Sequence, residues 1–154
     1  MVLGIYFGFH CKCVKKVKVF YKHGDGCLKG CLLIKGIGVD LVENERIKNL
    51  IQKWGQVFLD KVFLPEEIEY CSGKRDFPSC FAARIACKEA VFKAFGTEKL
   101  TWKDVKVVKT LHGAPQIKLL GNALAFWEKS SLKHLNISLS HSRNYSIAVA
   151  TIEM

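Results

Sequence analysis

The chain has 154 residues, enough for one domain with a hydrophobic core and too few for two domains of ordinary size. Its 24 Lys and Arg outnumber 14 Asp and Glu, and the formal net charge of +10 favours an anionic partner such as a nucleic acid, an acidic protein or a polyphosphate. No apolar run reaches the length of a membrane span, and no basic residue precedes the apolar opening stretch, so we expect neither a membrane partner nor a signal peptide.

Residues 1–33 differ in composition from the rest of the chain. Residues 1–34 carry six Lys against one Asp, and they hold four of the seven cysteines. We therefore predict an extension over 1–33, non-native or disordered, and a functional domain over 34–154. The odd cysteine count without an export signal predicts reduced thiols and a cytoplasmic location.

From residue 34 the pattern predicts a compact α+β domain. A short buried strand is expected over 36–41 and a helix with apolar residues at helical spacing over 43–54. Pro65, followed by two acids, is a typical helix start. A long helix is expected over 79–95, with Gly96 as its C-cap.

The last third of the chain predicts shorter elements. They are strands over 105–109 and 116–120, a helix over 121–131, and a final pair of strands over 135–139 and 146–152.

Two acids stand out by their setting. Asp40 ends the first predicted strand, and Glu89 lies in the long helix among apolar and basic neighbours. On that helix Arg84 and Lys88 are four residues apart, as are Glu89 and Lys93. The four side chains therefore form one charged stripe, and the alanine-rich opposite side can face the core.

These features have an ordinary interpretation and a functional one. The stripe can be a solvated helix face with one ion pair, and Asp40 can cap the helix that follows it. Alternatively, two carboxylates hold Mg²⁺ and three cations bind phosphate, which suits phosphate-transfer chemistry. The residue types alone leave both interpretations open.

Three sequence blocks resemble one family. They read GIGVDLVENERI over 36–47, FAARIACKEAVFKAFGT over 81–97 and SLSHSRNYSIAVA over 138–150. In this order they resemble the holo-acyl-carrier-protein synthases, the small bacterial type of phosphopantetheinyl transferase. The resemblance implies an α+β fold with an antiparallel sheet and one long central helix, assembled as trimers with each site at a subunit interface.

The resemblance also implies the reaction and most of the site. The reaction moves 4′-phosphopantetheine from coenzyme A to a serine of apo-acyl carrier protein, and 3′,5′-ADP leaves. Asp40 and Glu89 correspond to ligands of a catalytic Mg²⁺. Lys88 and Lys93 correspond to basic residues near the coenzyme A phosphates, and Arg84 to an arginine that contacts coenzyme A. Lys93 and the metal would stabilise charge on the pyrophosphate and the leaving group.

Two more positions follow from the resemblance. His141 matches the histidine of an SxSH motif that lies near the coenzyme. Arg46 matches an arginine that engages the acidic helix of the carrier protein, and a basic protein would attract such a partner. The group that accepts the serine proton is left open between Glu89 and a metal-bound water. We expect no nucleic acid as a partner.

The sequence departs from the family pattern in two places. Glu98 follows Gly96-Thr97, where the family often has glycine, and this acid could weaken coenzyme binding or point outward. The family usually begins near Ile34, and Leu33 stands where its initiating methionine usually falls. Translation could therefore begin at Leu33.

Two other functions remain as alternatives. The early cysteines with His10 and His23 could form a zinc site on a basic nucleic-acid-binding arm; these cysteines are Cys11, Cys13, Cys27 and Cys31. The second alternative is an inactive relative that only binds carrier proteins. The presence of both carboxylates and all the cations argues against it. We interpret Cys71, Cys80 and Cys87 as structural, because the reaction needs no protein nucleophile.

Overall fold

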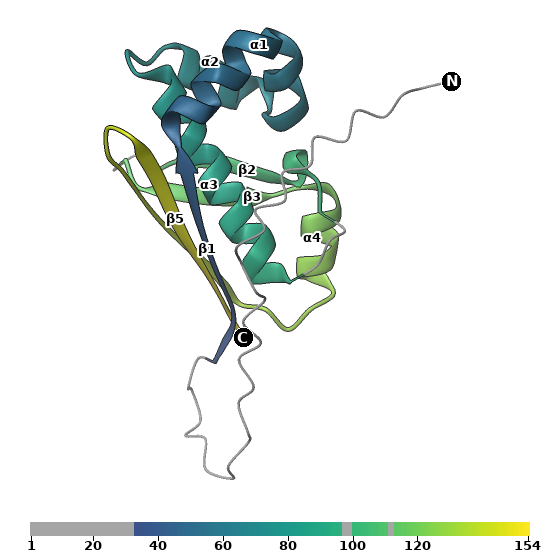
Figure 1. The fold of residues 1–154 in the computed structure, drawn as a ribbon. Helices are drawn as coiled ribbons and strands as arrows, with labels where there is room; N and C mark the ends of the chain where they lie inside the picture. The colour runs from purple at the N-terminus through teal and green to yellow at the C-terminus, as the bar shows by residue number, and fades with distance from the viewer. Residues whose placement is uncertain (1–32, 97–99, 111–112) are drawn as a thin grey trace.

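The computed structural model describes residues 33–96, 100–110 and 113–154, and Figure 1 shows its fold. In chain order the elements are β1 (Ile34–Glu43), α1 (Asn44–Val62), α2 (Pro65–Ser72), α3 (Phe77–Phe95), the 3-10 turn η1 (Trp102–Asp104), β2 (Val105–Lys109), β3 (Pro115–Leu119), α4 (Gly121–Glu128), β4 (His134–His141) and β5 (Tyr145–Glu153). The predicted α+β class is confirmed.

Three antiparallel strands form the main sheet, in the order β1-β5-β4. Asp40 lies opposite Ala148, and Val39 lies opposite Val149. Along β1 and β5 buried and exposed residues alternate, because successive side chains of a strand point to opposite faces. One face of the sheet is therefore buried and the other is exposed. Strands β2 and β3 form a separate antiparallel pair.

Helix α3 lies along the buried face of the main sheet, at the centre of the molecule (Figure 1). The backbone N–H of Ser79 donates to the side chain of Asp76 at its start, and Gly96 ends it in the left-handed conformation, at a φ of 66°. Gly96 is thus the C-cap that the sequence predicted. A methyl group at Gly38 would collide with the carbonyl oxygen of Ala90 on α3, so glycine lets β1 lie directly on the helix.

Helices α1 and α2 gather at one end of α3 (Figure 1). The expected helix over 43–54 stops where Gly55 adopts a φ of 49°, but a second helical segment continues beyond this kink to Val62. Helix α2 begins at Pro65, as predicted. The expected helix over 121–131 ends at Glu128. None of the helices in the described ranges is long and apolar enough to cross a membrane.

Candidate active site

Asp40 and Lys93 meet between β1 and α3. Asp40 points toward the helix and is 8% exposed. The Nζ of Lys93 donates to Oδ1 of Asp40 at 2.7 Å and to the carbonyl oxygen of Val39 at 2.9 Å. The interpretation of Asp40 as a helix cap is wrong, because Glu43 occupies the N-cap position of α1.

Glu89 completes a cluster of two carboxylates and one cation. It lies one helical turn before Lys93 on α3 and is half-buried. Burial, and to a smaller extent the negative charge of Asp40, raise the pKa of Glu89 to about 7 against the opposing charge of Lys93. Burial also raises the pKa of Asp40 against the opposing effects of Lys93 and Arg46. The two carboxylates therefore share one poorly solvated place that would favour a bound cation.

Arg46 lies near this cluster, and His141 does not. Arg46 is an exposed residue of the first turn of α1, and its charge favours the ionised form of Asp40. His141 ends β4, and β5 lies between β4 and β1. Because neighbouring strands are about 4.8 Å apart, about 10 Å separates β4 from β1. One chain therefore does not place His141 beside Asp40.

Asn44 is a structural residue of this region that the sequence analysis missed. Its side chain donates to the carbonyl oxygens of Ser142 at 3.1 Å and Arg143 at 3.2 Å, and it accepts a hydrogen bond from Ser146 at 2.8 Å. These contacts fix the turn after His141 to the start of α1. The asparagine directly after the Asp40 strand is the signal that could have identified it.

Lys88 lies inside the protein. Its side chain is 0% exposed, and its Nζ donates to Glu67 at 2.7 Å and to the carbonyl oxygens of Val62 at 3.0 Å and Trp102 at 2.9 Å. An ammonium group has three protons, and all three have acceptors. The predicted contact of Lys88 with a coenzyme phosphate does not fit this geometry. The interpretation of the charged stripe as a solvated helix face does not fit it either, because Lys88 is buried. Glu67 was not among the residues predicted from the sequence.

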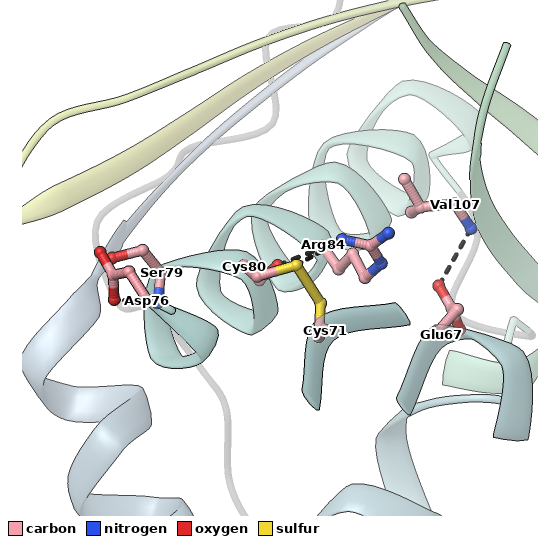
Figure 2. The surroundings of a disulfide bond; sticks show 7 residues. All are labelled: Glu67, Cys71, Asp76, Ser79, Cys80, Arg84 and Val107. Carbon is pink, nitrogen blue, oxygen red and sulfur yellow. Dashed lines mark hydrogen bonds between the residues drawn. A yellow bond between two sulfur atoms is a disulfide. The ribbon is translucent and has the colours of Figure 1, made fainter. Parts of the chain in front are cut away.

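Arg84 is held against a disulfide bond, as Figure 2 shows. Its Nη1 donates to Sγ of Cys80 at 3.0 Å, and its side chain is almost completely buried, with the residue 7% exposed. Cys80 is bonded to Cys71, with their Cα atoms 5.5 Å apart. The expectation of reduced thiols is therefore wrong for this pair. Cys87 remains a free thiol, and burial raises its pKa to about 12, so it stays protonated at neutral pH.

A group of positive charges surrounds Tyr70, directly before the disulfide. The guanidinium of Arg84 lies 4.5 Å from the ring centroid, Nζ of Lys74 lies 4.4 Å from it, and Nζ of Lys109 lies 5.8 Å from it. Burial raises the pKa of Tyr70, but a hydrogen bond with Lys109 and the three charges outweigh it and lower that pKa. Three cations at one aromatic ring form a place where an anionic group could bind.

Glu98 and the early cysteines with their two histidines lie outside the described residues. The zinc interpretation and the effect of Glu98 therefore stay predictions. The boundary of the extension at residue 33 is also a prediction.

Comparisons with known proteins show the family of the chain. The family model of the 4′-phosphopantetheinyl transferase superfamily matches residues 36–150. A holo-[acyl-carrier-protein] synthase of Halothermothrix orenii is 40% identical over 118 residues, which cover 75% of this chain and 94% of that protein.

Solved structures give the same result for the fold. The holo-[acyl-carrier-protein] synthase of Neisseria meningitidis has a TM-score of 0.72 at 29% identity, covering 79% of this chain and 100% of that chain. The corresponding synthase of Helicobacter pylori, crystallised in complex with coenzyme A, has a TM-score of 0.66 at 30% identity, covering 75% of this chain and 98% of that chain.

Proposed function

Because this chain belongs to the holo-acyl-carrier-protein synthases of the 4′-phosphopantetheinyl transferase superfamily, we propose that Asp40, Glu89 and Lys93 form its active site. The enzyme transfers the 4′-phosphopantetheine of coenzyme A to a serine of apo-acyl carrier protein, and 3′,5′-ADP is the second product. The observation that carries the site is the 2.7 Å contact of Lys93 with Asp40 beside the half-buried Glu89.

Mg²⁺ fits the donor set of Asp40 and Glu89. In the described residues no three His, Cys, Asp or Glu side chains gather around one point, so the protein offers the ion two carboxylates at this place. This number suits Mg²⁺, which usually takes its other ligands from substrate phosphates and water. When bound, Mg²⁺ neutralises negative charge on the pyrophosphate of coenzyme A. The ammonium of Lys93 lies beside the carboxylates and would stabilise charge on the same group.

Arg84 and the charges around Tyr70 are the proposed second contact for coenzyme A. Lys74 and Lys109 share that ring with Arg84, so one phosphate of the coenzyme could meet several cations there. His141 stays in the proposed set, and Lys88 is removed from it because all its protons are used inside the protein.

A trimer with shared sites is supported by the exposed face of the main sheet. Five apolar side chains of β1 and β5 are 37–59% exposed on that face, and they are Ile37, Val39, Leu41, Ile147 and Val149. A row of this kind is typical of a surface that a second copy covers. We propose that in this assembly His141 of a neighbouring copy reaches the site, because one chain does not place its own His141 beside Asp40.

The carrier protein and the cellular location complete the proposal. Arg46 is exposed near Asp40, where it would meet an acidic carrier protein as it delivers its serine. A cytoplasmic location remains part of the proposal, but the disulfide between Cys71 and Cys80 removes the argument from reduced thiols.

The reaction is tested by intact mass of an apo-acyl carrier protein after incubation with this protein, coenzyme A and Mg²⁺. The expected result is a gain of one phosphopantetheine, located on a serine by fragmentation. A carrier protein with that serine replaced by alanine is the control and should not gain mass. A wild-type carrier protein that keeps its mass would favour the inactive relative.

A further inference from the structure

The pair of Lys88 and Glu67 is the most buried ion pair in the described part of the chain. The two side chains are 0% and 1% exposed, whereas Lys93 and Asp40 keep 23% and 10% of their side chains in contact with solvent. A buried pair of charges gives little net stability, because removing both ions from water costs about as much as their attraction returns. A role in specifying geometry is therefore worth testing.

Glu67 joins the pair to the surrounding backbone. Its Oε2 accepts from the N–H of Leu64 at 3.0 Å as well as from Lys88, and its Oε1 accepts from the N–H of Val107 at 3.0 Å (Figure 2). Lys88 adds bonds to the carbonyl oxygens of Val62 and Trp102. One ion pair thus fixes α3 to the end of α1, the start of α2, the turn η1 and strand β2.

This attachment sets the rotation of α3. Successive residues of a helix differ by about 100° around its axis, so a fixed direction for Lys88 also fixes the direction of Glu89. Many of the other buried side chains of α3 are alanines: Ala82, Ala83, Ala86, Ala90 and Ala94. Small side chains interlock weakly with their neighbours and oppose rotation or sliding less than a directional polar network does.

We propose that Lys88 and Glu67 are positioning residues for the transfer reaction, because they hold α3 at the rotation that directs Glu89 toward Asp40. The two consecutive charges Lys88 and Glu89 then have separate tasks. Lys88 faces α2 and orients the helix, and Glu89 faces β1 and acts at the site. The inference rests on the proposed site at Asp40 and Glu89.

The test replaces both charges by apolar side chains of similar size, as Lys88→Met with Glu67→Leu. The matched control is Lys106→Met with Glu66→Leu, which removes an ion pair of 2.8 Å between α2 and β2, two of the elements that the buried network joins, but at the surface. Three quantities are measured: thermal unfolding, kcat with coenzyme A, and the affinity of the protein alone for Mn²⁺ by electron paramagnetic resonance. Loss of folded molecules lowers the number of Mn²⁺ sites, whereas a misdirected Glu89 lowers the affinity of each site.

The expected result is a folded double variant whose Mn²⁺ affinity and kcat both fall about tenfold or more, while the control variant keeps both. If the double variant does not fold, the same three quantities are measured for Glu67→Gln, which removes one charge at constant size. The same falls in Mn²⁺ affinity and kcat are expected. Wild-type affinity and kcat in the folded variant, or an equal loss in the control, would overturn the positioning role. Absence of Mn²⁺ binding by the wild-type protein would instead remove the metal site, and the inference with it.

Discussion

Asp40 and Glu89 carry the first prediction at the scale of single residues. Asp40→Asn or Glu89→Gln should lower kcat in Mg²⁺ by about a hundredfold or more, because removing one group that stabilises transition-state charge costs about 3 kcal/mol. Each variant keeps its size, so thermal unfolding should change little. Steady-state rates of holo-acyl carrier protein formation measure the loss. The control is Glu43→Gln, an exposed carboxylate at the end of the same strand. Wild-type rates in either site variant, or in excess chelator, would contradict the site.

Arg46 carries a second prediction, on recognition of the carrier protein. Arg46→Glu should raise KM for the carrier protein at least tenfold and flatten its salt dependence, because it removes electrostatic attraction for an acidic partner. KM for coenzyme A should stay within twofold. Lys53→Glu makes the same charge change on the same helix and is the control. Equal increases in KM for the carrier protein in the two variants would mean that Arg46 acts only through the net charge of the protein. A change in KM for coenzyme A would instead place Arg46 in the coenzyme subsite.

Single residues also show how far the sequence could predict the site. Asp40 and Lys93 are in contact, as expected of one site, because the strand and the helix were both recognisable. The position of Lys88 was not predictable, because its acceptors come from Glu67, Val62 and Trp102, which are 14 to 26 residues away. A local pattern shows which residues share a helix face, but not which part of that face another element covers.

At the scale of elements, the disulfide between α2 and α3 gives a third prediction. Protein purified without reductant should yield a linked peptide containing Cys71 and Cys80. Cys71→Ser should lower the free energy of unfolding by about 2–3 kcal/mol without reductant, because the bond closes a short loop in the unfolded chain. The difference from wild type should shrink when both proteins are reduced. Full alkylation of both thiols in the unreduced protein would contradict the bond.

Element boundaries were predictable where residues with special backbone properties mark them. Gly96 ends α3 and Pro65 begins α2, since each residue has a conformational preference that acts locally. The helix beyond Gly55 was missed because a kink and an end look alike in sequence. Strand β1 is longer than expected, since β5 offers it partners from Ile34 to Glu43.

At the scale of the whole molecule, the exposed sheet face predicts assembly. Light scattering after size exclusion should give a trimer for the wild-type protein. Val149→Glu, on that face, should give a monomer, because assembly would bury an unpaired charge. Val57→Glu is the same change at an exposed apolar residue of α1 and should leave the trimer intact. A fully active monomeric wild type would contradict the shared-site proposal.

Shared sites can also be tested by enzyme activity, independently of the molecular mass of the assembly. Asp40→Asn and His141→Ala chains should each have low activity alone. When they are co-expressed, about a quarter of the sites in a randomly mixed trimer would combine an intact Asp40 with an intact His141 from a neighbour. Activity near that fraction would support a site built from two copies. No recovery, with mixed trimers present, would place His141 and Asp40 in the same copy. Full activity of the His141→Ala chain alone would make His141 dispensable.

The last prediction is that the part of the extension before Leu33 is dispensable for catalysis. The family model matches residues 36–150, and the relative from Halothermothrix orenii is covered over 94% of its length by 75% of this chain. Leu33 exchanges two backbone hydrogen bonds with Met154, at 3.3 and 3.0 Å, so a chain that starts at Leu33 keeps the whole of β1. A protein of residues 33–154 behind an initiating methionine should have kcat and KM within twofold of the full chain.

A shorter protein that starts at residue 39 serves as the control for this truncation. It lacks Gly36 and Gly38, which lie directly on α3, and it loses four of the nine residue pairs between β1 and β5, so it should not fold. Loss of activity in the 33–154 protein, together with one zinc ion per full chain by metal analysis, would overturn the prediction. That result would give the cysteines and histidines of the first 31 residues a structural task, because a bound zinc ion stabilises the fold that holds its ligands.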